Sequence, residues 1–363
     1  MMDVRRKVIF PLLAMLIGLT VGLFLVELLL RASSLAPVTK LHSVDSSEFE
    51  RIPGIWQSNQ DVVSNEVPAL PHRVKTNSIG YRGEEFPVKK PEGELRILMT
   101  GDSFTFGAFV NNSETLPAQL QKQLRAVCGT NSIRVINAGL SGGTIIGQTE
   151  IIRRGLVLEP DLVVLVFYEN DIPDLRSPLW GRMAHNRELK SRFPMNFLWP
   201  VLRNTATWNF GLKLKQLWRR RGWRSATVTK LTDDGVRAQD RRELRDLKAL
   251  YLRTLLGTHK LVRQRNIEFV FLIYPDYSSL NGSDPLKLHS WAEQAGRSGG
   301  MPTFSLFRGM REGLGAIEKG FLLPHDGHPS PLGHEIAAGS STQFLLSQEP
   351  LRQACHGLIS AAR

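Results

Sequence analysis

The stretch that decides the fold is Arg96-Ile-Leu-Met-Thr-Gly-Asp-Ser-Phe-Thr-Phe-Gly107. Its apolar run, 97–99, is typical of a buried β-strand, and the run ends abruptly in Gly-Asp-Ser. Glycine permits a tight turn, while Asp and Ser favour turns and helix caps. Leucines at helical spacing between 116 and 124 predict a helix after the turn. Open α/β sheets hold their reactive groups at the carboxyl ends of strands, so Ser103 is a candidate nucleophile.

Strands alternate with helices over most of the chain. We expect strands at about 95–99, 133–137, 162–167, 267–274 and 302–306, and helices at about 114–126, 145–158, 237–265, 286–298 and from about 335. This alternation predicts βαβ units and a parallel sheet. The run 162–167 is apolar throughout, as expected of a strand that is covered on both faces.

The N-terminus has the pattern of a membrane segment. Arg5-Arg6-Lys7 precede an uncharged apolar run at 8–26, which is long enough to span a bilayer. A cleaved signal peptide would have a shorter apolar run and a small-residue cleavage site, so an uncleaved signal-anchor is the favoured interpretation. Positive residues stay on the cytoplasmic side, and the rest of the chain is therefore predicted outside the cytoplasm.

We expect three parts along the 363 residues: a cytoplasmic tip and transmembrane signal-anchor at 1–31, a linker and N-terminal extension at 32–94, and an α/β domain at 95–363. In the extension, Arg82 and Glu84 either form a surface ion pair or serve the packing against the domain. A net charge of +12 is typical of proteins that bind nucleic acid. Outside the cytoplasm, anionic lipid or acidic polysaccharide is the better expectation, and we expect no nucleic-acid partner.

A tryptophan-rich insertion interrupts the domain at about 174–235. It carries five of the seven tryptophans, with basic residues between them that are densest from Trp218 to Arg224. Three interpretations stay open: a packed helical cap, a surface that touches the membrane, or a carbohydrate platform with stacked rings.

The chain has two cysteines, Cys128 and Cys355. An oxidising compartment would allow one bridge between them. Two unpaired buried thiols are the favoured expectation.

Polar residues that follow the predicted strands have the types that acyl transfer needs. Ser103 requires a base, for which His328 is the candidate, and Asp326 is placed to orient the imidazole. The oxyanion needs donors, which the backbone N–H groups of Ser103 and Gly142 and the side-chain amide of Asn170 would supply. A parallel sheet would bring these groups to one edge.

Four blocks of the sequence resemble those of the SGNH hydrolases, also called GDSL-type esterases. The blocks are Gly101-Asp102-Ser103, Asn137-Ala-Gly-Leu-Ser-Gly142, Glu169-Asn170-Asp171 and Asp326-Gly-His328-Pro329, and the resemblance spans about 95–344. Two of them depart from the usual pattern. Glu169 stands near a position where glycine is common, and Asp326-x-His328 is one residue shorter than Asp-x-x-His. With the shorter spacing, the histidine rests either on Asp326 or on a backbone carbonyl.

The resemblance implies a flavodoxin-like, doubly wound sheet in which Ser103, Asp326 and His328 are catalytic and Ser103, Gly142 and Asn170 form the oxyanion hole. It implies a serine esterase that needs no metal or organic cofactor and acts on an acyl ester or acylated carbohydrate, with polysaccharide-synthesis proteins as possible partners. An O-acetyltransferase with the same site and a non-catalytic polysaccharide-binding or scaffold subunit are the alternatives. A zinc site built on the histidines at 325, 328 and 334 is disfavoured, because no further ligand cluster accompanies them.

Overall fold

The computed structural model describes residues 2–33, 35, 41–64, 67, 69–223, 238–283 and 287–361. The chain forms two compact units. The helical unit comprises Met1–Lys40 and Lys190–Leu231, and the sheet unit comprises Leu41–Leu189 and Thr232–Arg363.

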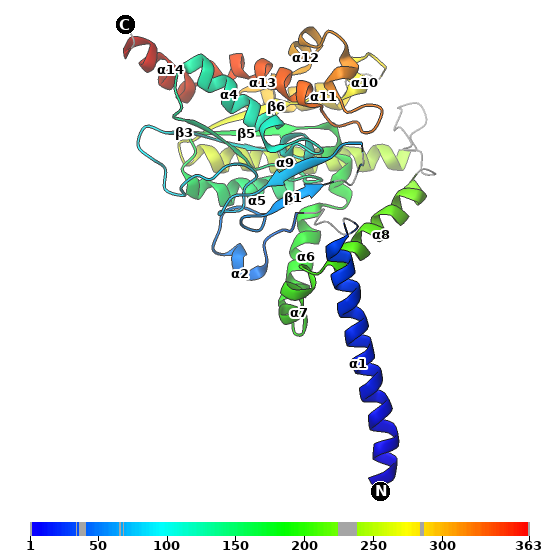
Figure 1. Cartoon of the computed structure of the whole chain (residues 1–363). Helices are drawn as coiled ribbons and strands as arrows, with labels where there is room; N and C mark the ends of the chain where they lie inside the picture. The colour runs from blue at the N-terminus through cyan, green and yellow to red at the C-terminus, as the bar shows by residue number, and fades with distance from the viewer. Residues whose placement is uncertain are drawn as a thin grey trace. The chain divides into compact units, whose positions relative to one another are not determined.

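The helices and strands follow the order expected for an α/β chain (Figure 1). The strands are β1 (Asp61–Ser64), β2 (His72–Lys75), β3 (Leu95–Thr100), β4 (Ile133–Asn137), β5 (Leu162–Phe167), β6 (Glu268–Ile273) and β7 (Thr303–Ser305). The α-helices are α1 (Met2–Ala32), α2 (Ser46–Phe49), α3 (Ser103–Phe106), α4 (Leu116–Cys128), α5 (Ile145–Gly155), α6 (Leu179–Ser191), α7 (Met195–Leu202), α8 (Ala206–Trp223), α9 (Ala238–Arg263), α10 (Tyr277–Leu280), α11 (Lys287–Ser298), α12 (Phe307–Gly313), α13 (Pro331–Leu346) and α14 (Glu349–Ala361). Short 3₁₀ turns are η1 (Asn112–Glu114), η2 (Leu156–Leu158), η3 (Glu169–Asp171), η4 (Pro173–Arg176) and η5 (Ile317–Gly320).

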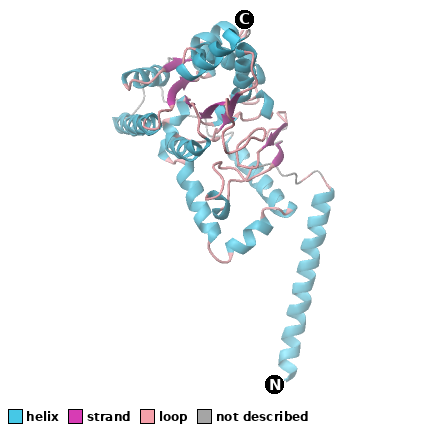
Figure 2. Ribbon diagram, turned by 90° about the vertical axis from the view of Figure 1, so that its left-hand side faces the viewer, coloured by secondary structure: helices cyan, strands magenta, loops and turns pink. Residues whose placement is uncertain are grey.

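The central sheet is parallel, with the strand order β4-β3-β5-β6-β7. This is the flavodoxin-like order, in which the chain first builds outward on one side of β3 and then on the other. The prediction of a flavodoxin-like, doubly wound sheet is confirmed. Figure 2 shows the magenta strands of this sheet among the cyan helices, with the β1–β2 hairpin apart from them.

Both faces of the sheet are covered, because successive side chains of its strands point to opposite faces. Ile97 and Met99 of β3 pack in one core cluster with leucines of α4 and alanines of α13. Leu98 packs in the other cluster, with isoleucines of α5 and with Tyr251 of α9. Figure 1 shows α4 and α13 on one side of the strands and α5 and α9 on the other.

Part of the stretch predicted as linker and N-terminal extension, 32–94, forms regular structure. It contains α2 and β1, and β1 pairs antiparallel with β2. Ile55, Tyr81 and Phe86 are buried in the same cluster as Leu98. Residues 41–94 therefore pack as part of the sheet unit.

The closing helix begins earlier than the predicted position near 335. The Ser330 hydroxyl accepts a hydrogen bond from the Gly333 N–H at 3.1 Å, and Pro331 occupies the first helical position, which proline favours. As a result, His334 lies in the first turn of α13 rather than in a loop.

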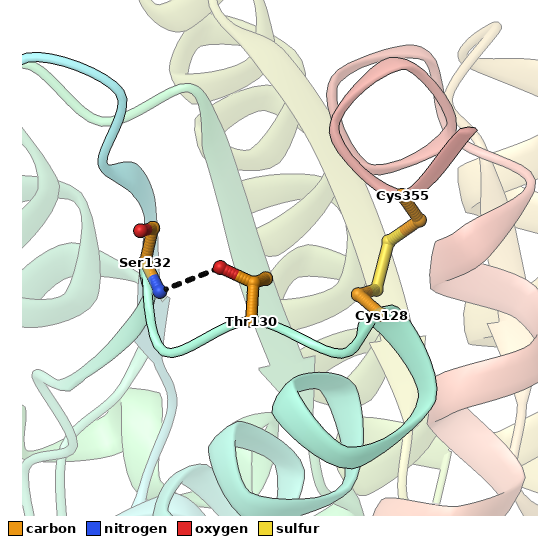
Figure 3. The surroundings of a disulfide bond; sticks show 4 residues. All are labelled: Cys128, Thr130, Ser132 and Cys355. Atoms are coloured by element: carbon orange, nitrogen blue, oxygen red, sulfur yellow. Dashed lines mark hydrogen bonds between the residues drawn. A yellow bond between two sulfur atoms is a disulfide. The ribbon is translucent and has the colours of Figure 1, made fainter. Parts of the chain in front are cut away.

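Cys128 and Cys355 form a disulfide, so the expectation of two unpaired thiols is wrong. Cys128 is the last residue of α4 and Cys355 lies on α14, and these helices are neighbours on one face of the sheet (Figure 3). The bridge joins two halves of the sheet unit that are 227 residues apart in sequence.

The helical unit contains the candidate membrane span. One stretch of α1, Ile9–Ala32, is long and apolar enough to cross a bilayer, with a mean hydropathy of 2.6 and none of it buried. The insertion folds into helices in its described part, which ends at Trp223. Of the expected tryptophan–arginine cluster, the side chains at 218–223 and all of Arg224 lie outside the described part of the structure.

Candidate active site

The turn after β3 fixes Ser103 at the start of α3. A side chain at Gly101 would place its Cβ 2.2 Å from Thr105 Oγ1 and 2.9 Å from the Val166 carbonyl oxygen, so the close approach of these strands requires glycine. Asp102 then caps the helix, since its Oδ1 accepts a hydrogen bond from the Phe104 N–H at 2.9 Å. Ser103 is 5% exposed and its hydroxyl faces the loop before α13.

The structure brings Ser103, His328 and Asp326 together. Ser103 Oγ lies 2.8 Å from His328 Nε2, although the two residues are 225 positions apart in sequence. The other ring nitrogen, Nδ1, is hydrogen-bonded to Asp326 Oδ1. The histidine is thus held between a hydroxyl and a carboxylate, which is the arrangement that activates a serine nucleophile.

The shortened Asp326-x-His328 spacing works because the loop makes a turn around the carboxylate. Asp326 Oδ1 also accepts the backbone N–H of His328 at 2.8 Å, as in an Asx-turn. One oxygen therefore holds both the backbone and the ring of His328. The alternative, in which Nδ1 rests on a backbone carbonyl, is wrong for this structure.

Gly142 lies in the loop after β4, at the same edge of the sheet as Ser103. The Leu140 N–H donates to the Gly101 carbonyl at 2.9 Å, which keeps this loop beside the turn that carries Ser103. Gly142 has φ 73°, in the left-handed region, and a Cβ there would meet only Leu179 Cδ2 at 3.6 Å. Glycine is therefore needed at this position for its backbone conformation rather than for space.

Asn170 lies in η3, directly after β5 and thus next to β3. Burial raises the pKa of Asp102, and the side chain of Asn170 lies near enough to that carboxylate to lower it. An amide nitrogen carries two hydrogens, so one can bond Asp102 while the other stays available to a ligand. Ser103, Gly142 and Asn170 thus follow three adjacent parallel strands at their carboxyl ends.

Two fully buried carboxyl groups accompany these donors. Burial raises the pKa of Asp102 to about 6. The hydrogen bond from the Phe104 N–H and the charge of His328 oppose this rise but do not cancel it. Burial and the neighbouring charge of Asp102 raise the pKa of Asp171 well above its usual range. Asp171 Oδ1 accepts a hydrogen bond from Gln148 Nε2 at 3.1 Å. The pair therefore favours a neutral Asp171 that serves as a hydrogen-bonding group.

Aromatic rings hold the histidine in place. Phe104 and Phe109 each lie 5.3 Å from the His328 ring, measured between centroids, and the Phe109 contact is edge-to-face. Tyr168 stacks on Phe104 at 3.7 Å. Phe109 has φ 64°, which is uncommon for a bulky residue, so the loop that carries it must be fixed by its surroundings.

Arg82 supplies that fixation, and sequence reasoning left its role open. It is 3% exposed, which excludes the surface ion pair with Glu84. Its guanidinium donates to the carbonyl oxygens of Phe106 and Gly107 at 2.7 Å each and of Val110 at 2.6 Å. A buried arginine with these partners joins the N-terminal extension to the loop after the nucleophile. The sequence offered packing against the domain as one role for Arg82, but it did not indicate these contacts.

The two other histidines considered as zinc ligands, His325 and His334, take no part in the hydrogen bonds that join Ser103, His328 and Asp326. His334 is fully buried in α13. Its pKa is lowered to about 3, mainly by burial and to a smaller extent by the charges of Arg82 and His328. His325 is exposed on the loop. Among the residues that the structure describes, no group of three or more His, Cys, Asp or Glu could hold a metal ion.

A scan against protein-family models finds no match, and a search of curated proteins finds none either. Solved structures that are similar include a protein assigned to the G-D-S-L lipolytic family from Desulfitobacterium hafniense, with 14% identity, 69% of this chain and 99% of that chain covered, and a TM-score of 0.38. An acetylxylan esterase from Geobacillus stearothermophilus has 17% identity, 72% and 99% covered, and a TM-score of 0.41. A two-domain esterase active on acetylated mannans has 16% identity, 69% and 49% covered, and a TM-score of 0.39.

Proposed function

We propose that the chain is a serine ester hydrolase of the SGNH type, anchored in a membrane and acting outside the cytoplasm. The observation that carries the proposal is the 2.8 Å contact between Ser103 Oγ and His328 Nε2, with Asp326 on the opposite ring nitrogen. A serine hydroxyl is a weak nucleophile without such a base, and this geometry is within the range for proton transfer.

In the proposed reaction, Ser103 Oγ attacks the carbonyl carbon of the ester while His328 Nε2 takes the hydroxyl proton. Asp326 stabilises the imidazolium that forms. The negative charge on the former carbonyl oxygen would be met by the N–H groups of Ser103 and Gly142 and by the free amide hydrogen of Asn170. Collapse of this intermediate breaks the bond to the alcohol, which leaves with the proton from His328. The acyl group stays on Ser103 until water attacks it.

The disulfide supports the proposed compartment. Structural disulfides persist in oxidising environments outside the cytoplasm, and Cys128–Cys355 is one. The basic residues in the first turns of α1, before Ile9, would stay in the cytoplasm, which supports a location of the sheet unit outside it. An alkaline phosphatase fused after residue 60 should be active, and an inactive fusion would refute this topology.

The proposed substrate is an acyl ester, with an acylated carbohydrate as the favoured class. The support for this class is the resemblance of the sequence blocks to those of the SGNH hydrolases, whose membrane-anchored members are often tied to acylation or deacylation of surface polysaccharides. The acceptor of the acyl group is water in an esterase and a sugar hydroxyl in an O-acetyltransferase, and both would use the same acyl-enzyme.

One assay separates these functions. The full chain in detergent is incubated with nitrophenyl acetate, with and without an oligosaccharide, and both free acetate and acetylated sugar are quantified. The proposal predicts acetate release that Ser103→Ala abolishes. Acetylated sugar with negligible acetate would establish the transferase instead. No turnover of either kind by the wild type would leave the non-catalytic scaffold as the better account.

A further inference from the structure

We propose that α7 and the start of α8 lie in the outer interface of the membrane that α1 spans, so that the helical unit contacts lipid along a second surface. This inference rests on the proposed placement of α1 across a membrane. It adds a contact that the ester hydrolase function does not require.

The start of α8 is fixed to α1 by hydrogen bonds. The Glu27 carboxylate accepts from the N–H groups of Ala206 and Thr207 at 2.8 and 2.9 Å, and from the Thr207 hydroxyl at 2.8 Å. Arg31 Nη2 donates to the Asn204 carbonyl at 3.1 Å. A carboxylate at a helix N-terminus satisfies N–H groups that have no partner within the helix and interacts favourably with its dipole. These contacts give α8 a defined position along α1.

That position corresponds to the membrane surface. Glu27 follows Ile9, the first residue of the candidate span, by 18 residues, or about 27 Å along a helix. The hydrocarbon core of a bilayer is about 30 Å thick. If the span begins at Ile9, Glu27 reaches the far boundary of the core, and the groups that it binds lie in the interface there.

The helix before this junction, α7, has two different faces. Phe197 and Val201 lie four residues apart on α7 and are 76% and 63% exposed, and Phe193, in the turn just before this helix, is 87% exposed. Residues at this spacing line one side of a helix. On another side, Trp199 meets Trp208 edge-to-face at 5.6 Å, and Lys190 Nζ lies 4.0 Å from the Trp199 ring. The inner contacts thus leave an outer stripe of large apolar side chains uncovered.

A cavity of about 670 Å³ extends the apolar surface between α1 and α8. Its walls come from Leu23, Phe24, Leu202, Trp208 and Leu212, with Glu27 and Lys215 among its polar members. In water this hollow and the stripe on α7 would be an unusually large exposed apolar region. In a membrane, acyl chains fill such a hollow, and the ammonium group of Lys215 can face an anionic head group.

Lipid is the occupant that the observations favour over a sugar or a second copy. The stripe precedes the Glu27 junction, and this junction ties α8 to a helix in whose candidate span no residue is buried. Phe193, Phe197 and Val201 carry no hydrogen-bonding side chains, which sugar recognition requires. Large apolar side chains that are exposed beside a membrane span can insert into the boundary between head groups and acyl chains.

The test uses the full chain in lipid nanodiscs with an environment-sensitive fluorophore on single introduced cysteines. Phe193→Cys, Phe197→Cys and Val201→Cys report on the stripe, and the native disulfide stays closed to the label. Leu16→Cys, in the middle of α1, calibrates the core. Val157→Cys, 57% exposed in the sheet unit, is the matched aqueous control.

We expect the fluorophore emission to be blue-shifted at all three stripe positions. Lipid that is spin-labelled near the head group should quench this emission, and position 157 should show neither change. Position 16 should respond most to a label deep in the chain. Spectra at 193, 197 and 201 that match the control would overturn the proposal. A second contradicting result would be stripe fluorophores that neither aqueous iodide nor spin-labelled lipid quenches. Protein, and not lipid, would then cover the stripe. A position 16 probe that no lipid label quenches would refute the placement of α1 itself, and esterase activity measured in parallel shows whether the hydrolase proposal survives.

Discussion

Asp326 uses a single oxygen to hold both the backbone N–H and the ring of His328, which leads to an unusual prediction for its amide variant. In Asp326→Asn, the amide oxygen can still accept both hydrogen bonds, so the loop and the tautomer of His328 are retained. What is lost is the charge opposite the developing imidazolium. A hydrogen bond to a charged group contributes about 1.5–3 kcal/mol, so kcat should fall roughly 10- to 150-fold.

Asp326→Ala removes the oxygen altogether. The ring then loses its orientation, and the decrease in kcat should reach about 10³–10⁴-fold, as when a catalytic histidine is held in the wrong tautomer. Steady-state kinetics with nitrophenyl acetate measure both variants, with KM expected to change little. His325→Ala, which alters an exposed side chain of the same loop, is the control and should retain activity. Equal losses in the Asn and Ala variants would refute the shared-oxygen argument, and unchanged kcat in both would remove Asp326 from the mechanism.

Three other features of the sheet unit make further predictions. Replacing Cys128 and Cys355 by Ala should lower the free energy of unfolding by about 2–4 kcal/mol, and reductant should lower the Tm of the wild type but not that of the variant. Arg82→Met leaves buried carbonyls without donors, so it should cost roughly 3 kcal/mol or more and reduce kcat, whereas Arg73→Met, which breaks an exposed ion pair, should cost less than about 1 kcal/mol. Asp171→Asn should stabilise the protein at pH 8 more than at pH 4. The raised pKa of Asp171 means that its contribution to stability is complete below the pKa of the unfolded state and is lost as the pH rises toward its folded value.

Each of these has a contradicting outcome. Equal melting of the wild type with and without reductant would mean that the bridge contributes nothing. Arg82→Met with the stability and kcat of the wild type would show that the loop carrying Phe109 does not depend on Arg82. A loss of stability in Asp171→Asn that grows between pH 4 and pH 8 would mean that Asp171 is charged in the folded state.

The sheet could be predicted because its signals are local. The apolar runs of β3 and β5 are buried along their whole length, and each run ends at a turn that the sequence marks. The crossover rules of parallel sheets reduce the possible strand orders to a few, and the order in this sheet is the flavodoxin-like one. The apolar pattern predicts the start of α13 near 335, which is too late, because Ser330 and Pro331 begin the helix before its first buried apolar residues.

The contacts that the sequence did not reveal join residues far apart in the chain. Cys128 and Cys355 are 227 residues apart, and only the packing of α4 against α14 brings their sulfur atoms together. The partners of Arg82 are backbone carbonyls, which carry no side-chain signal. The grouping of Ser103, Asp326 and His328 is predictable from residue types and strand ends. The turn by which one oxygen of Asp326 holds His328 is not, because it depends on the local backbone conformation of the loop.

The central claim is that Ser103 is an activated nucleophile. The most direct measurement is covalent labelling of the full chain with a fluorophosphonate, followed by peptide mass mapping of the adduct. The account predicts one adduct, on the peptide that carries Ser103, which is absent in Ser103→Ala and strongly slowed in His328→Ala. An unlabelled wild type, or equal labelling of Ser103→Ala, would contradict it.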